Sequence, residues 1–531
     1  MRFQLFAGGV VSLGLVLAVA ACGSSDADPG AGAADQDAGS SGSSGNTPPG
    51  SGDDDDDDDD TTKDGGSSGA PTLKSDSLVQ GEVILAGIAG DDVIYLELAQ
   101  AGASLHAVPL AGGAPTKIVD LGDDDDYLVN GGAVGIWTGV TGDLGTLNVW
   151  TRATLLKENV ATASIVGGLF RASPDGSRIA FTQTVTTTMQ GAPTSAQVGV
   201  RDTSAATNAV TLSGTAVNTG TAMNLAATAC VPRMSFAGKV FFATFCAGTA
   251  ADATNAKLVT VADGASAIVR LDAANNAAPT LKPVFVADST GTKLFTIATA
   301  NSAGVLVNVN PVSRTAIEDN VADGVMLPDG SAVVYRTTGN ALKKLATAAS
   351  STPSAVAADV KGLLRASGDN KKVLFNKLDR QQNNPLIDIN AVDHSAATPT
   401  PVALIPTAAA VPVGFSGDST LVFFIGDISQ TGAKLKSMPA AGGAAKVLTD
   451  TVGASPVSSG TGAVFASNPK QIGQAPNQFT VLEVGHVDAA TGKVSKIADS
   501  IPEGEFLTKD KRLVYSRFAQ QGSGLYAVTL P

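Results

Sequence analysis

The sequence is poor in the residues from which most enzyme sites are built. Among 531 residues there are three histidines and three cysteines, and only 5% are aromatic. His106, His394 and His486 are far apart and show no HxH or HxxxH spacing, so we predict no metal site and interpret them as ordinary strand or loop residues. No CxxC, no P-loop, no dinucleotide glycine fingerprint and no GxSxG elbow between a strand and a helix is present. We therefore predict no cofactor and assign no catalytic residue.

The part of the chain expected to fold also lacks net charge. The formal charge is −14, but residues 22–72 hold 13 Asp and one Lys, which leaves 36 acidic and 33 basic residues in 73–531. A nearly neutral domain has no basic stripe to neutralise a phosphate backbone, so we predict no nucleic-acid partner. The 59 glycines and the 44% hydrophobic content favour many short strands and turns over long packed helices.

The N-terminus carries the most specific signal. The stretch MRFQLFAGGVVSLGLVLAVAAC has one base, Arg2, and an apolar run shorter than the roughly 20 residues of a spanning helix, and it ends in small residues before Cys22. It resembles the lipobox of bacterial lipoproteins. The resemblance implies a signal peptide at residues 1–21, a diacylglycerol on Cys22, and a protein anchored to the cell envelope. Gly23 in place of Asp favours the outer membrane of a Gram-negative cell. An ordinary secretory leader or an anchored helix remains the alternative.

Residues 22–72 read as a tether. They consist mainly of Gly, Ser, Ala, Pro and Asp, including eight consecutive aspartates at 53–60. Such a segment has little apolar area to bury, so we expect a disordered spacer that reaches roughly 40 Å. A weak calcium site or a site for a basic partner is the alternative, but carboxylates without fixed geometry attract counter-ions rather than form a cage.

Residues 73–531 contain a repeated unit. SPDGSRIAF (173–181) has an Asp-containing turn followed by a short apolar strand, and LPDGSAVVY (327–335), SGDNKKVLF (367–375) and SGDSTLVFF (416–424) follow the same outline. Each unit reads as four antiparallel strands, and a period of about 40 to 50 residues is typical of propeller blades. Second strands are expected near Val93, Val134, Ile179, Val240, Leu294, Val333, Val373, Val422, Val464 and Leu513.

These units resemble the propeller repeats of the TolB C-terminal domain and of the prolyl oligopeptidase family. Ser173–Phe181 fits their SPDGxxIxF turn and strand nearly completely, whereas TKDKRLVY (508–515) lacks the Gly. The resemblance implies an all-β fold, a β-propeller of four-stranded antiparallel blades over 73–531. We count about ten units, and seven to ten blades fit. It implies no activity, because the additional domains of those families are missing from the pattern. The last unit ends after its third strand, so the segment 73–87 is expected to supply the fourth.

Three groups of residues have side chains that could form a disulfide or a binding site. Cys230 and Cys246 flank a predicted hairpin centred on Gly238, which favours a disulfide, with two buried free thiols as the alternative. Asp123, Asp124, Asp125 and Asp126 form an acidic blade connection that is a candidate for binding a cation or a basic partner, or simply a solvated loop. The repeated turn aspartates are interpreted as turn formers rather than ligands; they are Asp175, Asp329, Asp369, Asp418 and Asp510.

Topology indicates where binding is expected. The tight turns of the blades share one face, and the loops joining second to third strands share the other face with the blade connections. The loops 184–195, 246–255, 378–385 and 468–478 are long and polar. We predict a membrane-anchored module that binds a protein or polysaccharide on that face. The alternatives are a propeller enzyme, a glycan lyase or hydrolase acting at the central channel, and a structural surface protein.

Overall fold

The computed structural model describes most of the repeated region. The described residues are 73–99, 102–167, 169–187, 193–216, 233–247, 256–265, 268–271, 281–298, 300–348, 351–368, 371–378, 386–429, 432–449, 454–459, 462–472, 479–488, 491–502, 504–509, 511–519 and 522–530. They contain strands and turns and no helix, so these residues include no helical segment able to cross a membrane. Cys22, the predicted signal peptide at 1–21 and the predicted tether at 22–72 lie outside them.

The strands form ten four-stranded antiparallel blades, numbered here in chain order, and the outer strand of blade 3 also pairs with the second strand of blade 4, which joins these two sheets. Blades 1 to 5 contain β2 (Val83–Ala89), β3 (Asp92–Ala99), β4 (Gly102–Pro109) and β5 (Thr116–Leu121); β6 (Asp126–Asn130), β7 (Ala133–Thr141), β8 (Leu144–Thr151) and β9 (Leu155–Ile165); β10 (Arg171–Ala172), β11 (Arg178–Thr187), β12 (Pro193–Asp202) and β13 (Val210–Ala216); β14 (Arg233–Ala237), β15 (Val240–Ala247), β16 (Ala256–Val261) and β17 (Val269–Arg270); and β18 (Leu281–Ala287), β19 (Lys293–Ala298), β20 (Gly304–Asn308) and β21 (Ser313–Glu318).

Blades 6 to 10 follow the same order of strands. They contain β22 (Val321–Met326), β23 (Ala332–Thr337), β24 (Leu342–Ala346) and β25 (Ser354–Ala357); β26 (Gly362–Ala366), β27 (Lys372–Asn376), β28 (Leu386–Asp393) and β29 (Val402–Ala409); β30 (Val411–Phe415), β31 (Leu421–Ser429), β32 (Gly432–Pro439) and β33 (Lys446–Thr449); β34 (Ala454–Ser459), β35 (Gly462–Ile472), β36 (Phe479–Asp488) and β37 (Val494–Pro502); and β38 (Phe506–Lys509), β39 (Arg512–Arg517), β40 (Gly524–Thr529) and β1 (Ser75–Gln80).

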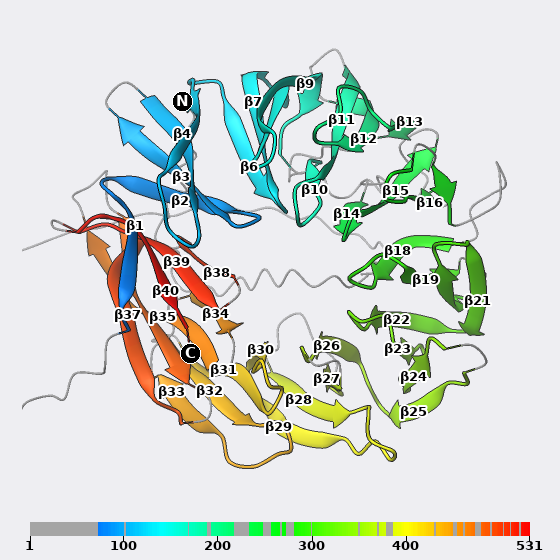
Figure 1. Cartoon of the computed structure of the whole chain (residues 1–531). Coiled ribbons are helices and arrows are strands. Elements are labelled where there is room, and N and C mark those ends of the chain that lie inside the picture. The colour runs from blue at the N-terminus through cyan, green and yellow to red at the C-terminus, as the bar shows by residue number, and fades with distance from the viewer. Residues whose placement is uncertain are drawn as a thin grey trace, which may run out of the picture. The chain divides into compact units, whose positions relative to one another are not determined.

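The blades succeed one another in a ring, coloured from blue to red in Figure 1. First strands of neighbouring blades contact each other, as β22 does with β26 and β26 with β30, which makes them the inner strands. The ring closes where β1 pairs antiparallel with β40, with Ser75 opposite Val528. The structure therefore confirms the propeller, the ten second strands and the N-terminal segment as the missing fourth strand of the last blade.

The repeated turn forms because its Asp accepts hydrogen bonds from neighbouring groups. In blade 3 the Asp175 carboxylate accepts bonds from the Ser173 and Ser177 hydroxyls, and Gly176 donates its N–H to the Ser173 carbonyl at φ 71°. Burial alone would raise the pKa of Asp175, but these bonds and Lys239 lower it to about 2. Asp418 is bonded in the same way to Ser416 and Thr420. The interpretation as turn formers is confirmed for these residues and for Asp329, whereas Asp369 and Asp510 lie outside the described residues.

The core lies between neighbouring sheets rather than inside one. Trp150 of blade 2 packs with Ile94 and Leu105 of blade 1, and Trp137 of blade 2 packs with Phe170 and Phe181 of blade 3. Both indoles are almost fully buried. Since each blade buries one face on each neighbour, the stability of the ring depends on every junction between blades.

Cationic side chains bridge several of these junctions near the start of a second strand. Arg178 at the head of β11 donates to the carbonyls of Lys239 (2.8 Å) and Ala262 (2.7 Å) in blade 4. Lys293 at the head of β19 donates to the Gly330 carbonyl in blade 6 (3.1 Å), and Lys372 at the head of β27 to the Ser419 carbonyl in blade 8 (2.7 Å). We call these contacts clamps. Each clamp is formed by the basic residue that ends the repeated turn, a residue to which the sequence analysis assigns no role.

Two expectations about local structure need correction. The segment 184–195 was expected to be a polar loop, but β11 continues to Thr187 and β12 begins at Pro193, because the β-branched run TVTTT favours strand. Strand β35 likewise continues to Ile472. The remaining parts of the expected loops, 188–192, 248–255, 379–385 and 473–478, lie outside the described residues. The first strand expected at 168–172 is only Arg171–Ala172, because Phe170 turns back to bond Gly167.

The hairpin that holds Cys246 is centred half a residue from the expected position, which shifts the pairing register by one residue. Ala237 pairs with Val240, so the centre falls between Gly238 and Lys239 rather than on Gly238. On that same edge of β15, Cys246 has Ala216 of β13 as its Cα partner. Cys230 lies outside the described residues, so the disulfide between Cys230 and Cys246 stays a prediction.

Candidate functional site

Strand β9 of blade 2 is the longest of the outer strands that the structure describes, and like β29 and β37 it shifts register twice against its neighbour. Strand β9 has 11 residues, whereas its counterpart β21 in blade 5 has six. Its ladder with β8 shifts register twice: Val149 pairs with Lys157, Leu147 with Ala161, and Gly145 with Ser164. More residues lie between these points on β9 than on β8. The surplus residues must bulge out of the sheet, and a bulge leaves part of the main chain without a ladder partner.

Asn148 supports the first bulge from inside the sheet. Its side chain is buried, and its Oδ1 accepts the Asn159 N–H at 2.8 Å. Asn159 (φ 54°) and Ala163 (φ 52°) adopt the left-handed backbone conformation that non-glycine residues seldom use. Such conformations cost free energy and persist only where the surrounding structure holds them, which makes this stretch of β9 a candidate functional segment.

Both ends of β9 are attached to blade 3. Near its start, Lys157 Nζ donates to the Ser204 carbonyl (3.4 Å) and to the Ala205 carbonyl. At its end, the Ile165 N–H donates to Thr182 Oγ1 at 2.8 Å, and the Ser164 hydroxyl lies 3.3 Å from the same atom. We call the stretch between these attachments, Asn159 to Ala163, the bow. Val160 and Ala161 in it are buried against Ile179 and Phe181 of blade 3, whereas Thr162 and Ala163 are exposed.

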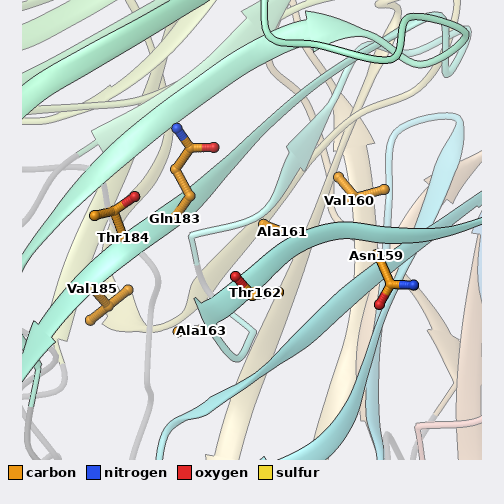
Figure 2. A pocket seen from close by; sticks show the side chains of 8 residues that line it. All are labelled: Asn159, Val160, Ala161, Thr162, Ala163, Gln183, Thr184 and Val185. Atoms are coloured by element: carbon orange, nitrogen blue, oxygen red, sulfur yellow. The ribbon is translucent and has the colours of Figure 1, made fainter.

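A groove of about 540 Å³ lies between the bow and strand β11. Figure 2 shows its two walls, Asn159–Ala163 from β9 and Gln183–Val185 from β11. The second wall is bulged as well, because Gln183 pairs with Gln197 but the next pair is Thr186 with Ser195, and Thr184 has φ 50°. The groove lies near the ends of both strands, where β11 enters a second-to-third loop and β9 enters a blade connection.

The groove is polar but uncharged. Its eight lining residues are Asn159, Val160, Ala161, Thr162, Ala163, Gln183, Thr184 and Val185, and none is ionisable. The Gln183 Oε1 accepts from Asn208 Nδ2 at 2.8 Å, which leaves the Gln183 amide N–H groups to donate elsewhere. Asn159, Thr162 and Thr184 are exposed. This lining can hold a neutral ligand through hydrogen bonds but supplies no acid, base or charged nucleophile for catalysis.

A second feature lies at the seam where the ring closes. Glu505 precedes β38, and its carboxyl group hydrogen-bonds the Ser516 hydroxyl, which in turn accepts the Leu85 N–H of blade 1 at 3.4 Å. Burial raises the pKa of Glu505 to about 7, although a bond from the Leu85 backbone opposes the shift. Burial and the charges of Asp126 and Glu505 raise the pKa of Tyr127. The sequence does not point to Glu505, because no local pattern shows that this carboxyl group becomes partly buried.

The acidic connection is built partly for structure. Asp125 accepts the N–H groups of Gly122 (2.8 Å) and Gly139 (3.1 Å), and Asp126 accepts that of Tyr127 (2.7 Å). Asp125 thereby joins the blade connection to the second-to-third turn of blade 2. Within the described residues no group of three metal-ligating side chains occurs, and the candidate cation or partner site at Asp123–Asp126 is not tested further by the structure.

The histidines lie apart in three different blades, in or beside third strands, as expected. His106 stacks on Tyr95 with ring centroids 5.3 Å apart, and burial lowers its pKa although Glu97 opposes the shift. His486 is 1% exposed, and burial lowers its pKa against the influence of Asp488. His394 is also buried, just after β28. Each one therefore packs within its own part of the fold.

No protein-family model and no curated protein matches the sequence. Among solved structures, the tricorn protease is 10% identical, with a TM-score of 0.28 and coverage of 86% of this chain and 61% of that one. The eukaryotic initiation factor is 13% identical, with a TM-score of 0.40 and coverage of 71% and 90%. The putative TolB from Agrobacterium tumefaciens is 15% identical, with a TM-score of 0.24 and coverage of 47% and 90%. The chain thus spans about three fifths of the tricorn protease, and these distant likenesses transfer no activity to it.

Proposed function

We propose that the protein is a binding module of the bacterial cell envelope, and that it holds an uncharged segment of a protein or polysaccharide in the groove between blades 2 and 3. The observation that supports this proposal is the groove itself. It combines exposed amide and hydroxyl groups with a strained, bulged backbone, and such backbone strain tends to occur at functional sites. The absence of ionisable residues from its lining favours binding over catalysis at this place.

The proposed cellular setting rests on the sequence. A lipid on Cys22 would attach the chain to a membrane, and a protein or polysaccharide partner would meet the propeller beyond the tether. A reach of roughly 40 Å would let the groove sample the space near the surface. Replacing Cys22 with Ser tests the anchor. The variant should move from the membrane fraction to the soluble fraction, and retention in the membrane fraction would show that the lipid anchor is wrong.

The binding function is tested with a variant that fills the groove. Thr162→Trp places a large side chain at an exposed lining position, and Thr315→Trp in β21 is the matched control on an exposed outer strand. Both proteins are probed against arrays of uncharged peptides and of neutral glycans. The proposal predicts ligands that bind the natural protein and Thr315→Trp but not Thr162→Trp. If every ligand binds all three proteins equally, the groove is not the binding site.

A second candidate function rests on Glu505. A carboxyl group with a pKa of about 7 is suited to act as a general acid, as a glycan hydrolase requires. Glu505 interacts with Ser516, Leu85 and Tyr127. These interactions bring no second carboxylate of the described residues to it. Glycoside hydrolysis generally uses a pair of carboxyl groups, so this candidate has an acid without its partner. Hydrolysis of neutral glycans that disappears in Glu505→Gln would support it over the binding module.

A further inference from the structure

We propose that the ligand of the groove is an extended peptide with small uncharged side chains, recognised through its main chain by the bulged strands β9 and β11. This inference rests on the proposed binding function and narrows its ligand to one class of molecule. The observations that carry it are the backbone of the two walls, the size of the lining side chains and the way in which the walls are fixed.

The walls expose main chain as well as side chains. One wall is five consecutive residues of β9 and the other is three consecutive residues of β11. In a regular strand successive side chains point to opposite faces, so side chains alone would line a groove at every second residue. Consecutive lining residues mean that backbone N–H and C=O groups border the groove on both sides.

Most of that backbone lies at bulges, outside the regular register of the sheets. Of the eight lining residues, only Ala161 and Gln183 have a Cα partner in their ladders, namely Leu147 and Gln197. The other six are Asn159, Val160, Thr162, Ala163, Thr184 and Val185, and of these Asn159 already donates its N–H to Asn148. Backbone polar groups near a surface bond to water or to a ligand when no strand pairs with them. An extended peptide offers donors and acceptors at the spacing of a strand, which is the basis of recognition by strand addition.

The side chains of the lining favour a peptide over a glycan. The groove contains small aliphatic groups from Val160, Ala161 and Ala163, and no aromatic ring on which a sugar face would stack. Its lack of charge also disfavours a ligand with ionised groups, since these would lose hydration without gaining a partner. Small neutral side chains, such as those of Ala, Ser, Thr and Val, fit between the walls.

The walls are fixed before the ligand arrives. Asn148 bonds the Asn159 N–H from inside the sheet, and Thr182 bonds the Ile165 N–H where β9 ends. Lys157 attaches the start of the strand to blade 3. Because the bow is held at both ends and at its first bulge, a ligand does not have to order it, and less free energy is lost on binding.

The test uses the full chain and peptides of about eight uncharged residues, each also made with single N-methyl groups along its backbone. Main-chain recognition predicts that N-methylation at alternate positions weakens binding about tenfold, whereas Ala-to-Ser exchanges in the peptide change it much less. Thr162→Trp and Gln183→Glu should both weaken peptide binding, and Thr315→Trp should not. Gln183→Glu is the second variant because it changes the groove without adding bulk.

The outcomes separate this inference from the proposed function. Groove-dependent binding of peptides that is sensitive to N-methylation supports the inference. If neutral glycans bind in the groove and peptides do not, the inference is overturned but the proposed binding function stands. The same conclusion follows if peptides bind in the groove and N-methylation does not weaken them. Binding that no groove variant weakens overturns both the inference and the proposed function.

Discussion

The junction between blades 2 and 3 differs from the junction between blades 3 and 4 in the position of the cation that crosses it. Blade 3 reaches blade 4 through Arg178, which is 1% exposed and lies at the head of the second strand. Blade 2 has Ala133 at the equivalent place, and its cation is Lys157 on the outer strand. One junction is thus crossed by a buried cation and the other by a cation on the outer strand. Main-chain bonds hold both junctions as well: Gly132 donates its N–H to the Ser173 carbonyl between blades 2 and 3, and β13 pairs with β15 between blades 3 and 4. The groove occurs at the junction whose cation lies on the outer strand, where β9 has surplus residues that bulge.

The largest expected effect comes from breaking the buried clamp. Arg178→Ala removes the donor to two carbonyls of blade 4 and the ion pair with Asp202 (3.2 Å), leaving buried groups unpaired. We expect the free energy of unfolding to fall by about 4 kcal/mol. Lys157→Ala, which breaks the contact of the outer strand, should cost less than about 1 kcal/mol, because its partners can turn to water. Urea denaturation of both variants measures the difference, and equal losses would remove the distinction between the junctions.

The seam between blades 10 and 1 adds a junction that responds to pH. The pKa of Glu505 is raised from 4.5 to about 7 in the fold, so the unfolded chain releases this proton at lower pH than the folded chain does. The contribution of Glu505 to the free energy of unfolding is therefore fully present below pH 4.5 and is lost as the pH rises through 7. The loss is at most about 3 kcal/mol. Glu505→Gln should flatten this part of the pH dependence, measured by denaturation at pH 5 and pH 8. An unchanged slope would mean that the carboxyl group is not buried.

A smaller change sharpens the account of the groove. Thr182→Val keeps the shape of the side chain but removes the hydroxyl that accepts the Ile165 N–H. We expect a loss of about 1 kcal/mol in the free energy of unfolding, together with weaker ligand binding because the bow loses one attachment. Thr260→Val is a control, since that buried hydroxyl bonds the Phe241 carbonyl in blade 4 far along the chain from the groove. It should cost similar stability and leave binding unchanged.

The repeated architecture was predictable, whereas the groove was not. The turn signals in SPDGSRIAF and its copies are local, so they located the ten second strands and implied that 73–87 closes the ring. The groove depends on a register break between β8 and β9, which a buried Asn148 stabilises from the next strand. Neither the break nor the burial of Glu505 has a local signature. The clamps do have one, a basic residue at the end of the turn, but its partner lies in the next blade.

Hydrogen exchange of individual amides tests the central claim most directly. If the walls of the groove carry main chain without ladder partners, the amides of Val160, Thr162 and Ala163 should exchange at least about tenfold faster than those of the regular outer strand β21. Addition of a peptide that binds the groove should slow them to the rate of a paired strand. Equal protection of β9 and β21 in the free protein, or no slowing by a bound peptide, would contradict the account.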